Sequence, residues 1–264
     1  MLLAVDIGNS SIDFGVFNEQ DSLLMTSKIS ADKAKCADEY AIVLQGILSL
    51  HRVAKEQITG CMIASVVPSL TVQVSIAVQK LFGIRPLEVG PGIKTGLNIR
   101  IDSQAELGAD IVANAAGALS LAKPPMILID VGTATTFTAI SAGGALEGVI
   151  IAPGVRVSLD ALASQTAELP DVSISMPKRV IGKNSRDSMN SGVIQGQALM
   201  IDGFSRKIRE ELKAERIRIF ATGGLAETVL PLCSPEIEYI PDLTLEGLRI
   251  LYHKNANPKN TNFK

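Results

Sequence analysis

Two short runs of this 264-residue chain combine residue types that can bind phosphate. They are Asp6–Ser11 and Asp130–Thr135, and each reads Asp-x-Gly followed by small hydroxyl or amide side chains. A glycine lets the backbone approach an anion closely, and backbone N–H groups and hydroxyls then serve as donors. The aspartate does not bind phosphate itself at neutral pH, so its role would be to hold a cation beside the phosphates. Two such loops could hold the phosphate tail of a nucleotide.

The two runs belong to longer segments that resemble each other at a constant offset of 124 residues. Residues 5–14 align without a gap with residues 129–138, and a short apolar strand precedes each copy, at 2–5 and 126–129. A second strand, a turn rich in helix and strand breakers and a third strand are expected after each copy. The turns are 18–22 and 141–144. One Asp-Gly turn alone indicates little, but a single duplication explains both copies and favours a shared function.

The rest of the chain repeats an order of strands, helix, strand and helix. Apolar spacing predicts helices over 38–51, 69–82 and 193–213 and strands over 60–67 and 216–221. Residues 109–123 are also helix-like, and we place the boundary between two α/β halves inside this stretch. The polar end of the chain, residues 256–264, is expected to fray.

A second candidate for nucleotide contact is the turn Thr222–Leu225, which contains Gly223 and Gly224. It follows a predicted strand and precedes a predicted helix, so a purine and ribose could lie flat against it. An ordinary strand-to-helix connection has the same pattern. The sequence alone does not distinguish such a connection from a nucleotide-binding turn. Neither Gly-x-x-x-x-Gly-Lys-Ser/Thr nor Gly-x-Gly-x-x-Gly occurs, which removes the common P-loop and Rossmann interpretations.

Composition excludes several other classes of function. Lys and Arg number 25 and Asp and Glu 27, and this net charge of −2 argues against binding nucleic acid or an anionic membrane. No apolar run reaches about 18 residues, so no transmembrane helix is expected. Two histidines and no Cys-x-x-Cys pattern argue against a histidine-rich or zinc-type metal site. We expect no signal peptide, because residues 1–5 have no basic region and Asp6 follows at once. Cys36, Cys61 and Cys233 are expected to be reduced core thiols of a cytoplasmic protein.

Two Asp-Gly loops in duplicated halves and a later Gly-Gly turn resemble the actin–hexokinase–Hsp70 superfamily. Within it, the chain is most similar to type III pantothenate kinase, whose motifs occur in the same order from Met1 to about Asn255. The matching runs are Asp6–Ser10, Gly90–Leu97, Gly108–Asp110, Asp130–Phe137, Ile151–Gly154, Ile181–Ser185, Ala221–Leu225 and Leu243–Leu248.

The resemblance implies an α/β fold of two duplicated ribonuclease H-like (actin-like ATPase) domains with a central cleft, each domain a mixed five-stranded sheet flanked by helices. It places the domains at 1–117 and 118–255, followed by the polar tail 256–264. The implied activity is ATP-dependent phosphorylation of pantothenate to 4'-phosphopantothenate, the first step of coenzyme A biosynthesis. A homodimer is also implied, with ATP and pantothenate as ligands and no nucleic acid or membrane.

The same resemblance implies roles for individual residues. Asp110 would be the general base, and Asp130 would hold a monovalent cation, K⁺ or NH₄⁺, while Mg²⁺ accompanies ATP. The implied ATP-binding residues are Asp6, Ile7, Gly8, Asn9, Ser10, Ser11, Ile12, Asp13, Thr133, Gly223 and Gly224. The implied acceptor-binding residues are Gly108, Ala109, Asp110, Ile111 and Ser185. Without the resemblance, the favoured interpretation of Asp110 is a helix N-terminal residue stabilised by the helix dipole.

The chain departs from the family pattern on the acceptor side. Ile111 stands where the family usually has arginine, and Ile101 where it commonly has tyrosine. An arginine would supply planar donors to a substrate carboxylate, and isoleucine supplies none. Three alternatives follow: pantothenate held by other groups such as Arg100, a different and less polar hydroxyl acceptor, or a paralogue that binds nucleotide and acts as an accessory or regulatory protein.

Overall fold

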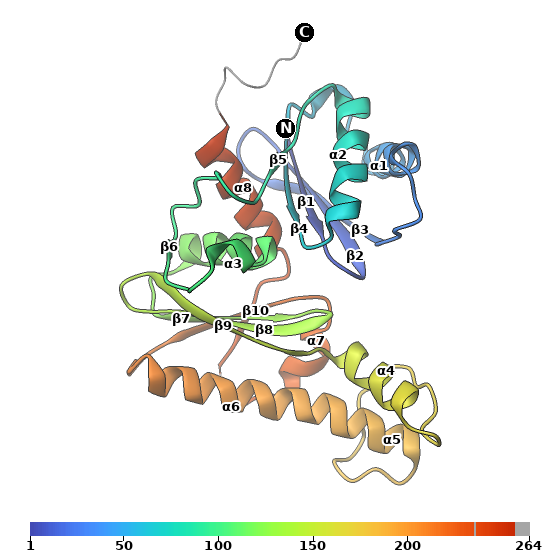
Figure 1. The fold of residues 1–264 in the computed structure, drawn as a ribbon, viewed down its shortest axis with the longest axis vertical. Coiled ribbons are helices and arrows are strands. Elements are labelled where there is room, and N and C mark those ends of the chain that lie inside the picture. The colour runs from blue at the N-terminus through green and yellow to red at the C-terminus, as the bar shows by residue number, and fades with distance from the viewer. Residues whose placement is uncertain (235, 257–264) are drawn as a thin grey trace. The chain divides into compact units, whose positions relative to one another are not determined.

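The protein folds into two compact units in a computed structural model that describes residues 1–234 and 236–256 (Figure 1). Of the described residues, the first unit comprises Met1–Leu97, Ser103–Ser120 and 242–256, and the second comprises Asn98–Asp102 and Leu121–Pro241. This division differs from the predicted single boundary after residue 117. The last helix packs within the first unit, and a short segment before residue 103 belongs to the second. Residues 257–264 of the predicted polar tail lie outside the described residues.

The first unit is built on a five-stranded mixed sheet in the order β3-β2-β1-β4-β5. Its strands are β1 Leu2–Ile7, β2 Ser11–Phe17, β3 Leu23–Ser30, β4 Gly60–Ser65 and β5 Leu87–Glu88. The first three strands form an antiparallel meander, and β4 runs parallel to β1 with Asp6 opposite Ala64. This order confirms the predicted meander of three strands and the further strand expected over 60–67.

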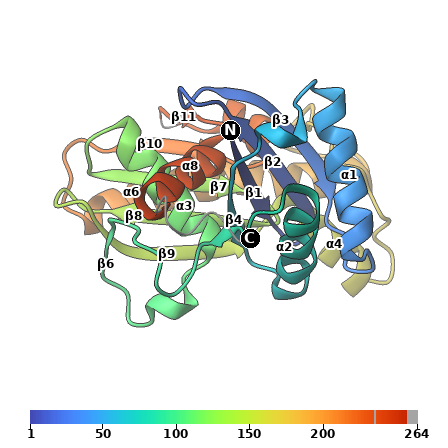
Figure 2. The same ribbon diagram turned by 90° about the horizontal axis from the view of Figure 1, so that it is seen from above.

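Helices cover both faces of this sheet because β1 alternates between two apolar cores. Its odd-numbered side chains, including Leu3 and Val5, face α1 Ala37–Leu50 and α2 Pro68–Phe82, whereas Leu2 and Ala4 face α3 Ala109–Leu121 and α8 Leu243–Asn255 (Figure 2). The short helices η1 Lys55–Gln57 and η2 Gln104–Glu106 lie in connections. Pro68 occupies the first turn of α2, and Gly83 ends that helix with φ +69°, as the sequence pattern of helix ends leads one to expect.

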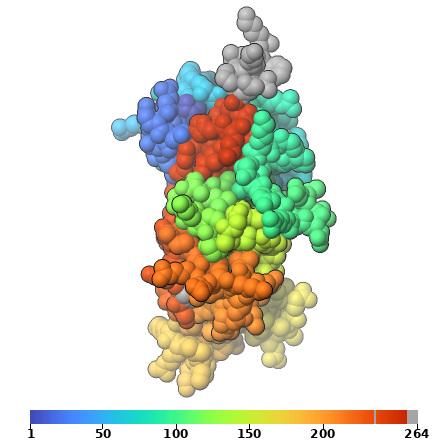
Figure 3. All heavy atoms as spheres, turned by 90° about the vertical axis from the view of Figure 1, so that its left-hand side faces the viewer, coloured from blue at the N-terminus to red at the C-terminus, as the bar shows by residue number. Residues whose placement is uncertain are grey.

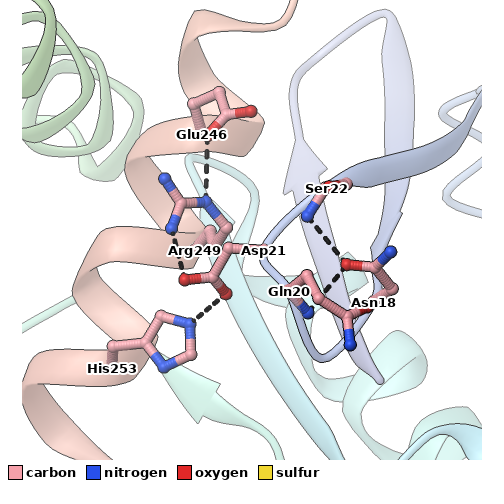
Figure 4. Close-up of polar contacts among 7 residues, drawn as sticks. All are labelled: Asn18, Gln20, Asp21, Ser22, Glu246, Arg249 and His253. Carbon is pink, nitrogen blue, oxygen red and sulfur yellow. Dashed lines mark hydrogen bonds and ion pairs between the residues drawn. The ribbon is translucent and has the colours of Figure 1, made fainter.

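Polar contacts tie α8 to the β2–β3 turn in the first unit (Figure 4). Arg249 donates to Asp21 at 2.9 Å and to Glu246 at 3.0 Å, and His253 Nε2 lies 2.7 Å from Asp21 Oδ1. The turn itself is held by Asn18, whose Oδ1 accepts from two backbone N–H groups at 2.9 Å. Figure 3 shows α8 between this turn and the segment that includes residues 90–97. These contacts explain why the last helix belongs to the first unit.

The second unit has a six-stranded sheet in the order β11-β10-β7-β8-β9-β6, one strand more than predicted. Its strands are β7 Met126–Val131, β8 Ala134–Ile140, β9 Ala145–Pro153, β10 Arg218–Thr222, β11 Glu238–Tyr239 and β6 Asn98–Ile99. The extra strand, β6, pairs in parallel with β9 at the sheet edge. The Arg100 N–H donates to the Leu146 carbonyl at 2.9 Å just beyond it, which extends the attachment.

The helices of the second unit are α4 Val155–Gln165, α5 Ser185–Asn190, α6 Gly196–Glu211, α7 Ala226–Val229 and η4 Leu230–Leu232. A π-helical segment, Ser191–Gln195, joins α5 to α6. The helix predicted over 193–213 therefore begins earlier, at Ser185, and its α-helical hydrogen bonding is interrupted by the π-helical segment. Phe137 of β8 meets Phe204 of α6 edge-on at 5.2 Å, inside the apolar core of this unit.

The two hairpins that carry the Asp-x-Gly runs confirm the duplication and refine its alignment. In the first, Val5 lies opposite Phe14; in the second, Ile129 lies opposite Phe137. The loop between the paired strands spans residues 8–11 in the first copy and 132–134 in the second, because Ile7 pairs with Ile12 and Val131 with Thr135. A gap of one residue therefore aligns the two buried phenylalanines, which the gapless sequence alignment did not.

The three cysteines are free thiols, but the prediction that all lie in the core is wrong. Cys61 is buried in β4, Cys233 is half-buried, and Cys36 is exposed at the start of α1. At Cys36 the backbone N–H donates to Glu39 at 2.8 Å, so the residue serves the helix end rather than the core. Among the described residues, no helix has the length and apolar character needed to cross a bilayer.

Candidate active site

The first Asp-x-Gly loop is a tight connection between β1 and β2. The Gly8 N–H donates to the Ser11 carbonyl at 2.9 Å, and a Cβ at Gly8 would lie 3.3 Å from that oxygen. Asn9 and Ser10, at the tip, are exposed. Ile7 and Ile12 are fully buried in the core, so the exposed groups of the loop come from the residues between them.

Asp13, the last residue of the predicted ATP loop, is held on β2 by two neighbours. Ser11 Oγ donates to its carboxylate at 3.0 Å, and Lys28, opposite it on β3, forms an ion pair at 3.0 Å. The carboxylate is thus partly neutralised within the sheet. Asp242, at the start of α8, has its pKa raised by burial and, to a lesser degree, by the negative charge of Asp13.

The second Asp-x-Gly loop is more tightly packed than the first. The Gly132 N–H donates to the Ala134 carbonyl at 3.0 Å, and the Gly154 N–H donates to the Thr133 carbonyl at 3.1 Å. A Cβ at Gly154 would overlap the carbonyl oxygens of Gly132 and Thr133. Only glycine allows this close approach of the end of β9 to the loop. The Thr133 residue itself is exposed.

The Gly223–Gly224 turn, which follows β10, lies against this second loop. Gly223 has φ +97°, and a Cβ there would lie 2.5 Å from Asp130 Oδ1 and 2.6 Å from the backbone N and C of Val131. The Leu225 N–H donates to the Val131 carbonyl at 3.1 Å, which fixes the turn on β7. The structure therefore brings together Asp130 and the Gly223 turn, which the sequence singled out separately.

Two glycines pack closely against the Asp130 carboxylate. A Cβ at Gly132 would lie 3.3 Å from Asp130 Oδ1, and a Cβ at Gly223 would lie 2.5 Å from the same oxygen. The backbone therefore approaches a carboxylate oxygen, which is the ligand type that hard cations prefer. Within the described residues, no group of three or more His, Cys, Asp or Glu side chains is arranged to hold a metal, so Asp130 would act with oxygens of other kinds.

Asp110 lies in the first turn of α3, as predicted. Its Oδ1 accepts from the Ile111 N–H at 2.8 Å, and a Cβ at Gly108 would overlap that same oxygen. Burial raises the pKa of the Asp110 carboxyl above its usual range, and the hydrogen bonds from backbone N–H groups offset only part of this effect. A carboxylate that is desolvated and held by one oxygen is a better proton acceptor than an exposed one.

The other predicted acceptor residues occupy contrasting environments. Ala109 and Ile111 are buried, at 8% and 7% exposure, so Ile111 presents its backbone rather than an exposed side chain. Ser185, the first residue of α5, is exposed and belongs to the second unit, whereas Gly108–Ile111 belong to the first. The side chain of Asn184 caps α5 by accepting from the Asp187 N–H at 2.8 Å.

The run Gly90–Leu97 is fixed by a residue that sequence reasoning missed. The Asn255 side chain, at the end of α8, accepts from the Lys94 N–H at 2.8 Å and donates to the Lys94 carbonyl at 3.0 Å. Two glycines of the run, Gly92 and Gly96, have positive φ. A lone asparagine near the end of a predicted helix carries no signal of this contact, because the partner lies 161 residues away.

A family model described as type III pantothenate kinase matches residues 2–207. The chain is similar to a protein from Shouchella clausii (strain KSM-K16) named type III pantothenate kinase, with 40% identity over 256 residues that cover 97% of this chain and all of that protein. The match spans both Asp-x-Gly loops and Asp110.

Solved structures share the fold at low identity. The ethanolamine utilization protein EutJ from Carboxydothermus hydrogenoformans superposes with a TM-score of 0.56 and 14% identity, covering 94% of this chain and 89% of that one. The activator of the 2-hydroxyisocaproyl-CoA dehydratase from Clostridium difficile, with bound ADPNP, gives a TM-score of 0.53 and 10% identity, covering 100% and 98%. These likenesses confirm the predicted actin-like ATPase fold and nothing finer.

Proposed function

The chain belongs to the type III pantothenate kinase family, and we propose roles for its loops and for Asp110 in the reaction of that family. It is a kinase that transfers phosphate from ATP to the alcohol group of pantothenate in coenzyme A biosynthesis. The observation that carries this function is the family match over 2–207 together with 40% identity along almost the whole chain to a named relative. The reaction uses ATP with a divalent metal, for which we propose Mg²⁺.

We propose that both Asp-x-Gly loops bind phosphate oxygens of ATP. In the first loop, residues 9–11 would offer backbone N–H groups and hydroxyls, and Gly8, whose own N–H donates to the Ser11 carbonyl, would keep the loop tight. Asp6 would hold the divalent metal. In the second, Thr133 would donate from an exposed position at the tip. The Gly223–Gly224 turn would lie against the adenosine. These roles are supported by the exposure of Asn9, Ser10 and Thr133 at the tips of the two loops.

We propose that Asp130 holds the monovalent cation, K⁺ or NH₄⁺. The oxygen ligand that its carboxylate offers, beside the close-packed backbone of Gly132 and Gly223, supports this assignment. Such a cation supplies positive charge beside the phosphates, which phosphoryl transfer requires because negative charge accumulates on the transferring group.

Asp110 would act as the general base. As the pantothenate hydroxyl oxygen forms its bond to the γ-phosphorus, the bond from that phosphorus to the β,γ-bridging oxygen breaks, ADP leaves, and the hydroxyl proton passes to the Asp110 carboxylate. The Ile111 N–H, 2.8 Å from Asp110 Oδ1, holds one oxygen and leaves the other for the acceptor. Gly108, Ala109 and Ser185 would complete the acceptor site.

We propose a cytoplasmic location for the protein, which its free thiols support.

A homodimer is supported by uncovered apolar surface on the second unit. Ile151 of β9 and Leu199 of α6 are 71% and 70% exposed, and Val157 and Leu162 of α4 are also exposed. A groove of about 530 Å³ runs along α4. Large apolar side chains left exposed on one unit mark an interaction surface, and we propose that a second copy of the chain covers it. Leu199→Glu should give a monomer in light scattering, whereas Leu50→Glu, at an exposed site of α1, should not.

The experiment that tests the site is Asp110→Asn. The kcat for pantothenate phosphorylation should fall by about 100-fold or more, while the Kd for ATP in calorimetry changes by less than about twofold. Glu106→Gln, an exposed carboxylate in the preceding turn, is the matched control and should leave both unchanged. A fully active Asp110→Asn enzyme would remove Asp110 from the role of base.

A further inference from the structure

A buried side-chain amide on α6 contacts both sides of the second phosphate loop. Gln197 is 6% exposed, and its Oε1 accepts from the Thr135 hydroxyl at 2.9 Å. Its Nε2 donates to the Pro153 carbonyl at 2.6 Å. Thr135 is the second residue of β8, the strand after the loop, and Pro153 is the last residue of β9, so one side chain connects the two strands.

The peptide group between Pro153 and Gly154 is held at both of its polar atoms. Its carbonyl oxygen accepts from Gln197 at 2.6 Å, and its N–H donates to the Thr133 carbonyl at 3.1 Å. Since a peptide group is planar and rigid, fixing the oxygen also fixes the direction of the N–H. Gln197 therefore acts on Thr133 through this peptide and on Thr135 directly.

Gln197 is a polar residue on a face of α6 that is otherwise apolar. The same face of the helix carries Ala198, Ile201 and Phe204 into the apolar core beneath β8. Gln197 lies at the end of this face nearest the loop, two residues after the π-helical segment that ends at Gln195. Such segments occur frequently at functional sites, where they change which side chains face inward. An apolar residue would suit the core equally well but would remove the partner of the buried Thr135 hydroxyl and the donor to the Pro153 carbonyl.

We propose that Gln197 is a positioning residue for ATP. It holds the Gly132–Ala134 loop so that the backbone N–H groups and the Thr133 hydroxyl stay directed at the phosphates before the nucleotide arrives. A donor set that is already oriented binds its ligand without a cost for reorganisation. This inference rests on the proposed role of the second loop in binding ATP and assigns to a residue outside that loop the control of its geometry.

The test compares isosteric variants of the full chain. Gln197→Met keeps the volume and removes both hydrogen bonds, and it should raise the KM and the Kd for ATP by about tenfold, with a change of less than about twofold in the KM for pantothenate. Thr135→Val should also raise the Kd for ATP. Thr135→Ser, which keeps the hydroxyl, should bind ATP with the wild-type Kd. The double variant Gln197→Met/Thr135→Val should bind ATP no more weakly than Gln197→Met, because both changes remove one shared bond.

A second buried amide of the same unit provides the matched control. The side chain of Asn190 bonds to the backbone at Ser173, Ser175 and Arg186, away from the phosphate loop. Asn190→Leu should lower the melting temperature about as much as Gln197→Met but leave the Kd for ATP unchanged. If Gln197→Met lowers stability alone, with ATP affinity equal to that of Asn190→Leu, the proposal is wrong. Should Gln197→Met fail to fold, Gln197→Glu and the Thr135 variants decide the question through the same Kd.

The outcomes also separate this inference from the proposed function. A wild-type chain that binds ATP but does not phosphorylate pantothenate contradicts the function, while the Kd comparison still decides the role of Gln197. A wild-type chain that phosphorylates pantothenate with a Gln197→Met variant of unchanged Kd for ATP contradicts only the role of Gln197. A wild-type chain without affinity for ATP contradicts both.

Discussion

Gly223→Ala probes the close contact between the adenosine turn and the second phosphate loop. The residue has φ +97°, a conformation that costs a non-glycine residue about 1–3 kcal/mol. The new Cβ would lie 2.6 Å from the backbone N and C of Val131 and 2.5 Å from Asp130 Oδ1. Backbone atoms cannot rotate away as a flexible side chain can, so β7 and the turn must separate, at a further cost of about 1–3 kcal/mol.

The two effects together predict a loss of about 3 kcal/mol in the free energy of unfolding, which lowers the melting temperature by about 6–12 °C. The Kd for ATP should rise by about tenfold or more, because the shift displaces both the turn and Asp130. Calorimetric titration with ATP and a thermal melt of the same sample measure both effects. Gly203→Ala is the control, since no heavy atom lies within 4 Å of its Cβ position in α6. That change should stabilise the protein by about 0.5–1 kcal/mol.

The reasoning is refuted if Gly223→Ala melts at the wild-type temperature and binds ATP with wild-type affinity. That result would mean that the turn accommodates a side chain at position 223 and does not require glycine there. A variant that is destabilised but binds ATP normally would keep the steric argument and remove the turn from the nucleotide site.

Three further predictions concern Asp110, Ile111 and α8. Because burial raises the pKa of Asp110, the folded state holds the carboxyl proton more tightly than the unfolded state does. The free energy of unfolding therefore falls as the pH rises from the ordinary aspartate pKa through the raised value. Asp110→Asn removes this effect and should melt at a higher temperature than wild type at neutral pH. The acid limb of kcat/KM should likewise lie at higher pH than for an ordinary aspartate. Ile111→Arg should lower the apparent KM for pantothenate, and an unchanged KM would indicate that other groups hold the carboxylate. Arg249→Met should cost about 1–2 kcal/mol in urea unfolding, against about 0.5 kcal/mol or less for Lys80→Met, whose ion pair with Asp38 is exposed.

Much of the fold could be predicted because its signals are local. The apolar strands before Asp6 and Asp130 and the helices near 37–50 and 68–82 follow from residue spacing alone. The one-residue difference between the two loops could not be read, because a gapless alignment already matched Asp and Gly. The pairing of Phe14 and Phe137 with equivalent partners appears only in the register of the strands.

The allocation of segments to units was the part that sequence did not predict. Residues 98–102 join the second sheet through β6, and α8 returns to the first unit through Asp21 and the apolar side chains of β1 and β4. Both depend on contacts between residues far apart in the chain. A two-residue strand and a helix that fits either half give no local sign of where they pack.

The residues of the candidate site also divide into those with a local sequence signal and those defined by long-range contacts. Asp110, Asp130 and the glycines were found because their types and order form motifs, and the structure adds that Gly223 lies against Asp130. Gln197 and Asn255 were missed because each acts through a single long-range hydrogen-bonding side chain. Ile111, expected to line the acceptor site with its side chain, is buried and offers its backbone N–H to Asp110.

The most direct test of the central claim is ADP release by the purified full chain, measured by a coupled assay with ATP, Mg²⁺ and K⁺, in the presence and absence of pantothenate. We predict ADP release that depends on pantothenate, is stimulated by K⁺ and yields one phosphorylated pantothenate for each ADP. Binding of ATP with no pantothenate-dependent release of ADP would contradict the assignment of this chain as a pantothenate kinase.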